Sequence, residues 1–200
     1  MRIIGLTGGI ACGKSNVSAT LRELGAAIVD GDLLSRELTA PGGAALAGIR
    51  ELFGSGVFTA AGELDRRALA GVIFSDAAAR AALDALMQPL LRELILQRID
   101  QARADGYALC VLDMPLLYEA GLDALCSRVW CVWIPREVQL TRLMARDGLT
   151  LPEAESRLAS QLPADEKAAR ADVVIDTGGS IEYTKAMIPD LYAQEIALSR

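Results

Sequence analysis

The chain has 200 residues, of which 52% are hydrophobic and 4% aromatic, and its formal charge is −6. This length suits one compact α/β domain with small inserted lobes, while the negative charge argues against a general nucleic-acid binder and the absence of any apolar run of about 18 residues argues against a membrane span. The sequence has no histidine, so a general base has to be a carboxylate, lysine, tyrosine or cysteine. Its four cysteines have no C-x-x-C spacing, which favours a reduced, cytoplasmic protein.

Five short apolar runs, separated by helical stretches, predict β-strands. Most of them are continuously apolar, a pattern typical of strands that are covered on both faces of a parallel sheet. The alternation of strands and helices therefore predicts an α/β fold with βαβ connections. The predicted strands are residues 3–7, 26–30, 108–113, 129–134 and 172–176.

The segment between the second and third strands is too long for a simple crossover, and we predict a helical substrate lobe at about 32–107. A long amphipathic helix is expected there, interrupted or kinked near Pro89. Its apolar residues recur at three- and four-residue steps and are Leu83, Leu86, Leu90, Leu94 and Ile95. A polar segment in which Pro152 and Pro163 start short helices is expected to form a mobile lid at about 146–169. The rest of the single domain, about 1–31, 108–145 and 170–200, forms the predicted core.

Residues 8–15 match the phosphate-binding pattern G-x-x-x-x-G-K-[ST] in full. A strand precedes the motif and a helix-compatible stretch, 15–24, follows it, which argues against a chance match in a glycine-rich turn. Such a loop turns its N–H groups toward an anion, while Lys14 faces the β- and γ-phosphates and Ser15 binds magnesium. The predicted ATP-binding residues are Gly8, Gly9, Ile10, Ala11, Cys12, Gly13, Lys14, Ser15 and Asn16.

Acidic residues follow two of the predicted strands. Asp30 and Asp32 come after the second strand, and Asp113 ends the third. In a parallel sheet these ends lie at the carboxyl edge beside the phosphate loop, so Asp32 is a candidate general base. Asp30 and Asp113, the latter at a position that resembles a Walker-B acid, are candidates to support magnesium. The alternative for each is a helix cap or a turn residue.

Three arginines late in the chain are candidates to stabilise a transferred phosphoryl group. Arg142 and Arg146 are four residues apart and share one helix face, and Arg157 lies in the predicted lid. The alternative is a solvated helix face whose arginines form ion pairs with Asp147 or Glu153.

The sequence gives expectations for three further residues, Cys12, Lys167 and Arg170. Cys12 lies in the anion-binding loop, so its thiol is either reactive through a lowered pKa or an inert small side chain. Lys167 and Arg170 are expected on the surface.

Together these motifs resemble the dephospho-CoA kinase family over nearly the whole chain. The phosphate loop alone is shared by many families, whereas the motifs at the strand ends are more specific. The matching segments are residues 4–10 with 13–15, Asp30-Gly31-Asp32, residues 113–119 (similar to the family's Asp-x-Pro-Leu-Leu-Phe-Glu), Arg142, Arg146, Arg157 and Gln161.

The resemblance implies a P-loop NTPase three-layer fold with a five-stranded parallel sheet, a helical insert and a lid. It implies transfer of the ATP γ-phosphate to the ribose 3′-hydroxyl of dephospho-CoA, with Mg²⁺ as cofactor and ATP as co-substrate. The implied catalytic residues are Asp32, Lys14, Arg142 and Arg146. The implied substrate-binding residues are Asp32, Gln88, Asp113, Leu116, Glu119 and Arg157, and the metal is expected at Ser15 with Asp30 and Asp113 as further candidates.

This sequence departs from the family pattern at three places. Ala11-Cys12 stands where the family usually has Gly-Ser, Gln88-Pro89 where it commonly has His-Pro, and Asp176-Thr177 where Asp-Asn is common. The Cβ of Ala11 is expected to affect ATP affinity locally, and Gln88 removes any role there that depends on charge.

Three alternatives remain beside this function. The nearest is another P-loop kinase acting on a nucleotide or small alcohol, although the large insert favours a bulky substrate. A GTPase-type switch would need an Asn-Lys-x-Asp motif, which the sequence lacks. A catalytically silent nucleotide-binding module is disfavoured because Lys14, Ser15 and Asp32 are all present.

Overall fold

The computed structural model describes residues 1–198. They form two compact units, Met1–Asp30 together with the chain from Gln101 onward, and Gly31–Asp100. No helix among the described residues has both the length and the apolar character that a membrane span requires.

The first unit is built on a five-stranded, wholly parallel sheet in the order β2-β3-β1-β4-β5. The strands are β1 (Arg2–Gly8), β2 (Ala27–Asp30), β3 (Leu109–Asp113), β4 (Arg128–Trp133) and β5 (Val173–Asp176). Each strand begins and ends within one residue of its predicted range, so the continuously apolar runs identified all five strands correctly.

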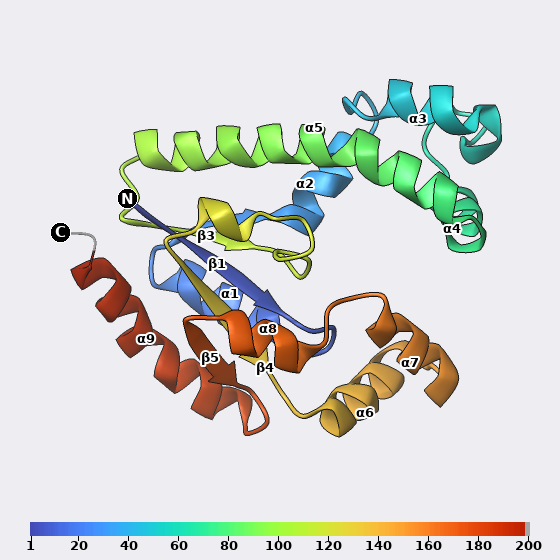
Figure 1. The fold of residues 1–200 in the computed structure, drawn as a ribbon. Coiled ribbons are helices and arrows are strands. Elements are labelled where there is room, and N and C mark those ends of the chain that lie inside the picture. The colour runs from blue at the N-terminus through green and yellow to red at the C-terminus, as the bar shows by residue number, and fades with distance from the viewer. Residues whose placement is uncertain (199–200) are drawn as a thin grey trace. The chain divides into compact units, whose positions relative to one another are not determined.

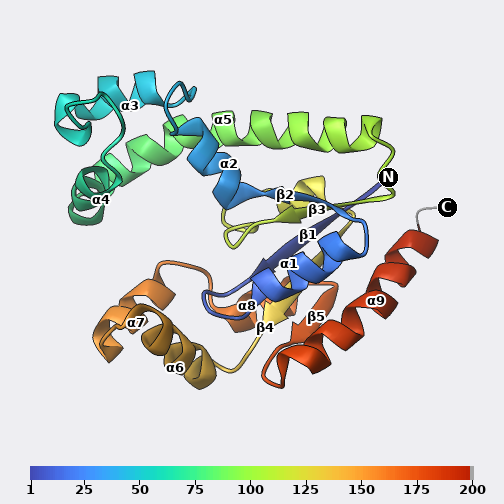
Figure 2. The ribbon, with the colours of Figure 1, turned by 180° about the vertical axis from the view of Figure 1, so that it is seen from behind.

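Helices cover both faces of this sheet and give the predicted three-layer fold. The helices of the first unit are α1 (Lys14–Glu23), α6 (Arg136–Asp147), α7 (Leu151–Ala159), α8 (Ala164–Arg170) and α9 (Ile181–Ala197), with the short 3₁₀ helix η2 (Asp123–Leu125). Helices α1 and α9 pack together over one face, and α8 lies against β1 and β4 on the other (Figures 1 and 2). Pro152 lies in the first turn of α7 and Pro163 caps α8, as expected for prolines that start helices.

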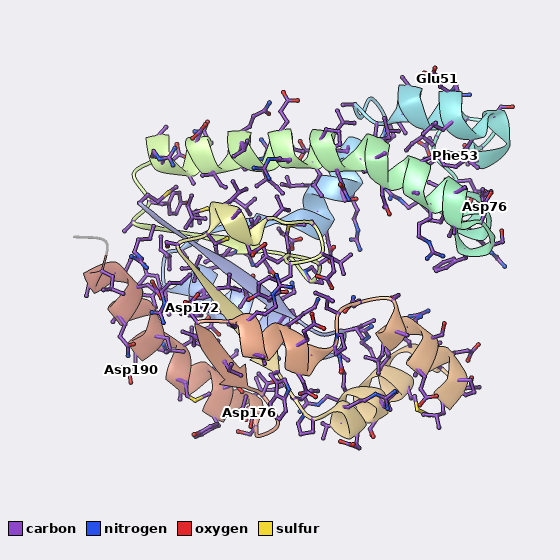
Figure 3. The ribbon with its side chains drawn as sticks, viewed as in Figure 1. Glu51, Phe53, Asp76, Asp172, Asp176 and Asp190 are labelled. Carbon is purple, nitrogen blue, oxygen red and sulfur yellow. The ribbon has the colours of Figure 1, made fainter. Side chains whose placement is uncertain are left out.

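Buried apolar side chains between the sheet, α1 and α9 form the main core of this unit. Ile4 and Leu6 of β1 are fully buried in it, as is Trp130 of β4. The edge strand β5 is bracketed by Asp172 and Asp176 (Figure 3), and the Asp172 carboxylate accepts the Val129 N–H at 2.7 Å. Because side chains of β1 and β4 are fully buried in this core, packing fixes these central strands and the positions of their carboxyl ends.

The second unit is helical. Its elements are α2 (Gly31–Leu38), α3 (Leu46–Phe53), the 3₁₀ helix η1 (Ser55–Val57), α4 (Arg66–Ser75) and most of α5 (Ala77–Ala104). Its core gathers around Ile49 and includes Leu83, Leu86, Leu90 and Leu94, four of the residues that predicted the amphipathic helix.

Helix α5 runs through Pro89 without interruption, so of the two predicted alternatives, an interruption or a kink, the interruption is wrong. Proline removes one backbone donor and crowds the preceding turn, which bends a helix more often than it ends one when packing holds both sides. Figure 1 shows α5 bent along its length. The helix starts at a cap in which the Asp76 carboxylate accepts the Ala78 and Ala79 N–H groups.

Candidate active site

The phosphate loop connects the end of β1 to the start of α1. Gly13, the residue before α1, has a φ of 84°, a left-handed conformation that glycine adopts without strain. At Gly8 a Cβ would lie 2.6 Å from the Val132 carbonyl oxygen, so β1 and β4 approach closely only because this residue is glycine. The loop therefore leads directly into the N-terminus of α1, where the free N–H groups favour an anion.

Ala11 is the one non-glycine residue with positive φ in the described part of the chain, at 62°. The Cβ of an L-residue in this conformation crowds the following carbonyl and costs about 1 kcal/mol. Its methyl group packs on the small cluster of Leu140, Leu143 and Ala154. This gives a physical reason why glycine suits the position, and it shows that the alanine is accommodated by packing from α6 and α7.

Charged and polar groups meet where β1, β2 and β3 end. The Lys14 ammonium forms an ion pair with the Asp113 carboxylate, and Asp113 is in register with Asp30 on the neighbouring strand β2. Ser15 is exposed in the first turn of α1. A hydroxyl and carboxylates are oxygen donors of the kind that Mg²⁺ prefers, so these residues fit the predicted ion. Residues 1–198 contain no group of three or more Cys, Asp or Glu placed to hold a metal, and phosphate oxygens would complete the set.

Thr177 ties the phosphate loop to the end of β5. Its hydroxyl donates to the Cys12 carbonyl at 2.6 Å and its N–H donates to the Trp133 carbonyl at 3.0 Å. Its own carbonyl accepts from Arg142 Nη2 at 2.9 Å. The threonine that replaces the family's common asparagine therefore has a defined structural role, and Arg142 lies beside the phosphate loop.

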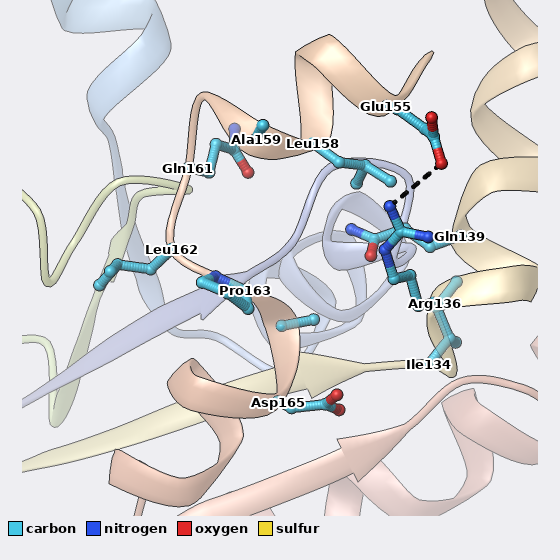
Figure 4. Close-up of a pocket in the computed structure, with 11 residues that line it drawn as sticks. Ile134, Arg136, Gln139, Glu155, Leu158, Ala159, Gln161, Leu162, Pro163 and Asp165 are labelled. Carbon is cyan, nitrogen blue, oxygen red and sulfur yellow. Dashed lines mark hydrogen bonds and ion pairs between the residues drawn. The ribbon is translucent and has the colours of Figure 1, made fainter. Parts of the chain in front are cut away.

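Two glutamines hold the backbone of Ile10 from two sides. Gln139 of α6 donates from Nε2 to the Ile10 carbonyl at 2.7 Å, and the Gln161 side-chain oxygen accepts the Ile10 N–H at 3.3 Å. Both glutamines line a cavity of about 290 Å³ between α6, α7 and the start of α8, crossed by the ion pair of Arg136 and Glu155 at 3.5 Å (Figure 4). The backbone of Ile10 thus joins the phosphate loop to α6 through Gln139 and to the predicted lid segment through Gln161.

Arg146 and Arg157 meet at one carboxylate. Arg146 Nε and Arg157 Nη1 lie 2.7 and 2.6 Å from the two oxygens of Asp147. The hydrogen bond from Arg146 lowers the pKa of Asp147 and in turn raises the pKa of Arg146. The alternative of ion pairs with Asp147 is therefore present in the structure, although both arginine side chains are about half exposed and face water.

Lys167 is fully buried, so its expected place on the surface is wrong. Its ammonium donates to the Pro115 carbonyl at 2.5 Å and forms an ion pair with Glu119 at 2.8 Å. Burial of a lysine requires such partners, and they come from the loop after β3. Arg170 is exposed as expected, with its guanidinium carbon 4.0 Å from the centre of the Tyr118 ring.

The remaining predicted residues lie on three elements. Asp32 is in the first turn of α2 and Gln88 is within α5, both in the second unit. Leu116 is exposed in the loop after β3. Their contacts with substrate stay predictions.

The thiol of Cys12 does not have the lowered pKa that a reactive group would need. Cys12 is 1% exposed, and burial raises its pKa from 9.0 to about 11, with the Gly9 backbone and Arg142 only partly opposing this shift. Burial also raises the pKa of the other three thiols, which are free as well. The inert interpretation of Cys12 is the one that the structure supports.

The sequence did not identify Gln139, Thr177 or Lys167 as parts of the site. Gln139 and Thr177 act through contacts with the phosphate loop that link residues far apart in the chain. Gln139 had no signal in the sequence, and Thr177 was noted only as a departure from the family's Asp-Asn, without a contact. Lys167 lies in a charged run that is typical of a solvated helix. Gln161 carried a signal, since it completes the Arg-x-x-x-Gln spacing from Arg157.

Comparison with known proteins identifies the relatives of the chain. The family model for dephospho-CoA kinase matches residues 2–182. A dephospho-CoA kinase of Anaeromyxobacter dehalogenans is 50% identical over 91% of this chain and 86% of that protein. One of Geobacter sulfurreducens is 46% identical over 97% and 98%. The crystal structure of TT1252 from Thermus thermophilus has a TM-score of 0.82 and 34% identity, covering 96% of this chain and 97% of that one.

Proposed function

Because the chain belongs to the dephospho-CoA kinase family, we propose that it transfers the γ-phosphate of ATP to the ribose 3′-hydroxyl of dephospho-CoA. The products are CoA and ADP, and the reaction is the last step of CoA biosynthesis. The observation that carries this proposal is the family match over residues 2–182 in a chain that retains the phosphate loop with Lys14 at the head of α1. Another P-loop kinase acting on a nucleotide or small alcohol has no comparable support.

The proposed reaction divides the work among three groups of residues. Asp32 accepts the proton of the ribose 3′-hydroxyl. At the same time the 3′-oxygen bonds to the γ-phosphorus of ATP, and the bond between that phosphorus and the β–γ bridging oxygen breaks, which releases ADP. Lys14 and the N–H groups at the start of α1 hold the β- and γ-phosphates. Arg142 and Arg146 stabilise the negative charge on the transferred phosphoryl group. Arg157 contributes to this stabilisation when its guanidinium leaves the ion pair with Asp147 and binds phosphate instead.

Mg²⁺ is part of the proposal as cofactor. Ser15, with Asp113 and Asp30 at the neighbouring strand ends, would hold it through oxygen atoms. When bound, the ion neutralises charge on the β- and γ-phosphates. Gln88, Asp113 and Leu116 are proposed to contact dephospho-CoA.

The proposed place of the enzyme is the cytoplasm, where ATP is available and thiols stay reduced. All four cysteines are free, which agrees with that compartment. A net charge of −6 gives no reason to propose a nucleic-acid partner.

An ADP-release assay coupled to NADH oxidation tests the function. Dephospho-CoA is compared with adenosine, AMP, shikimate and gluconate, and we expect turnover with dephospho-CoA to exceed the others by at least about 100-fold in kcat/KM. Equal turnover of AMP or shikimate would replace the proposal by the alternative kinase.

Two variants test the site within the same assay. Lys14→Ala should remove most activity while the protein stays folded, since it deletes a phosphate contact rather than core packing. Asp32→Asn should lower kcat by about 100-fold or more and leave ATP affinity nearly unchanged. A loss of ATP affinity with unchanged kcat would make Asp32 a binding residue only.

A further inference from the structure

Lys167 is a lysine with no exposed surface, and it lies outside the residues assigned to catalysis above. A buried ammonium group is retained at a cost unless several oxygen atoms surround it. Here the oxygens come from a single short segment, the loop from Met114 to Glu119. The Pro115 carbonyl accepts from Lys167 Nζ at 2.5 Å, and Glu119 Oε1 lies 2.8 Å from it.

The same contacts extend in two directions. Pro115 lies two residues after Asp113, the last residue of β3. Its carbonyl also accepts a hydrogen bond from the Thr7 hydroxyl of β1 at 3.0 Å. Glu119 Oε1 also accepts the N–H of Leu162 at 2.9 Å, in the segment that joins α7 to α8. Lys167, which lies within the predicted lid, is therefore the centre of a polar network that connects the loop after Asp113 with the segment between α7 and α8.

We propose that Lys167 is a positioning residue for the acceptor side of the reaction. It fixes the loop from Met114 to Glu119, which carries Leu116 and follows Asp113, and through Glu119 it anchors the α7–α8 segment of the predicted lid at Leu162. This inference rests on the proposed function and assigns Glu119 an internal role in place of a direct contact with substrate. None of the hydrogen bonds and ion pairs of this network is made by a residue of the phosphate loop or α1, the groups proposed to bind ATP. The network comes nearest to that loop at Thr7, just before Gly8, and at Leu162, just after Gln161.

The proposal predicts a particular split in the kinetic constants of Lys167→Met. Methionine matches the length of the lysine stem and stays apolar, and Glu119, which is partly exposed, is still able to bind water. We expect KM for dephospho-CoA to rise about tenfold or more, because small displacements of positioning groups have large effects. The Kd of ATP, measured by calorimetry, should change by less than about twofold.

A matched control exists at the opposite end of the sheet. Glu195 is 1% exposed and pairs with Arg2 and Arg128 at 3.0 Å each, where β1 and β4 begin. Glu195→Gln also removes one member of a buried ionic cluster in the same unit. It should lower the melting temperature and leave KM for dephospho-CoA unchanged.

Hydrogen exchange gives a second measurement that does not depend on activity. In Lys167→Met the amides of the Met114–Glu119 loop and of Leu162 should exchange at least about tenfold faster, whereas in Glu195→Gln they should not. Glu119→Gln keeps an acceptor for the Leu162 N–H but removes the charge opposite Lys167. It should show the same changes to a smaller degree, and it replaces Lys167→Met if that variant does not fold.

The outcomes are distinct. If Lys167→Met lowers the melting temperature but leaves KM and the exchange of both segments like those of Glu195→Gln, Lys167 is a structural residue and the inference is wrong. If the wild type does not act on dephospho-CoA, the proposed function fails, and the exchange comparison alone still decides whether Lys167 holds both segments.

Discussion

The buried hydroxyl group of Tyr118 allows the structure to be tested by removal of one oxygen atom. Its side chain is 8% exposed, and its hydroxyl is buried without a hydrogen-bond partner among the described residues. The family motif quoted above carries phenylalanine at this position. Tyr118→Phe removes only the hydroxyl and keeps the ring over which Arg170 stacks at 4.0 Å.

The expected gain at neutral pH follows from desolvation. A buried polar group without a partner costs about 1–3 kcal/mol, and the variant avoids this cost while it retains the packing. We therefore expect Tyr118→Phe to stabilise the protein by about 1 kcal/mol or more. For a chain of this size that corresponds to a rise of about 2–4 °C in melting temperature.

The same hydroxyl makes the gain depend on pH. Burial raises the pKa of Tyr118 from 10.0 to about 12 in the folded protein. Below pH 10 the hydroxyl is neutral in both the folded and unfolded states. Between about pH 10 and 12 only the unfolded state loses its proton, which favours unfolding of the wild type by up to about 2–3 kcal/mol. Phenylalanine does not titrate, so the advantage of the variant should widen across this range.

Urea denaturation of both proteins at about pH 7.5 and about pH 11 measures the two effects. Tyr107→Phe is the control, because Tyr107 is 41% exposed and its hydroxyl can reach water, so a change within about 0.5 kcal/mol is expected. If Tyr118→Phe destabilises the protein by 1 kcal/mol or its advantage stays constant with pH, the hydroxyl has a partner and the reasoning fails.

Other expectations concern the phosphate loop. Thr177→Val removes the 2.6 Å hydrogen bond to the Cys12 carbonyl, so we expect it to lower the free energy of unfolding by about 1–2 kcal/mol and to weaken ATP binding, measured by calorimetry, severalfold. Thr177→Ser keeps the hydroxyl and should behave like the wild type, and unchanged ATP affinity in the valine variant would contradict this role. Cys12, with its raised pKa, should react with iodoacetamide at about pH 8 some 100-fold more slowly than a free thiol, equally with and without ATP; rapid labelling that ATP prevents would reverse this. Ser15→Ala should raise the Mg²⁺ concentration needed for half-maximal activity, and an unaltered Mg²⁺ curve would remove Ser15 from the metal site.

Local patterns predicted the sheet well because they record burial directly. The strand at 108–113, for example, is continuously apolar up to Asp113, and the structure buries all of β3 between the helical layers. The phosphate loop was predicted equally well, because its backbone conformation and close contacts require glycine at fixed positions. Gly13 has the positive φ that this loop needs before α1.

The misjudged residues depend on partners that lie far away in the chain. Lys167 belongs to a short charged helix, and only its contacts with Pro115 and Glu119, about fifty residues earlier, take it out of water. Pro89 was expected to interrupt or kink α5, and the helix continues through it, with leucines on both sides of the proline packed in the core of the second unit. Helical periodicity correctly placed Arg142 and Arg146 on one helix, α6, and an ion pair with Asp147 was among the alternatives, but the contact of Arg142 with Thr177 had no local signal.

The most direct measurement identifies the phosphorylated product. The protein is incubated with ATP, Mg²⁺ and dephospho-CoA, and phosphorus NMR with mass spectrometry locates the new phosphate. We expect one new phosphomonoester on the ribose 3′-oxygen, formed in equal amount to ADP and absent with Lys14→Ala. A phosphate attached elsewhere, or ADP formed without a phosphorylated acceptor, would contradict the account.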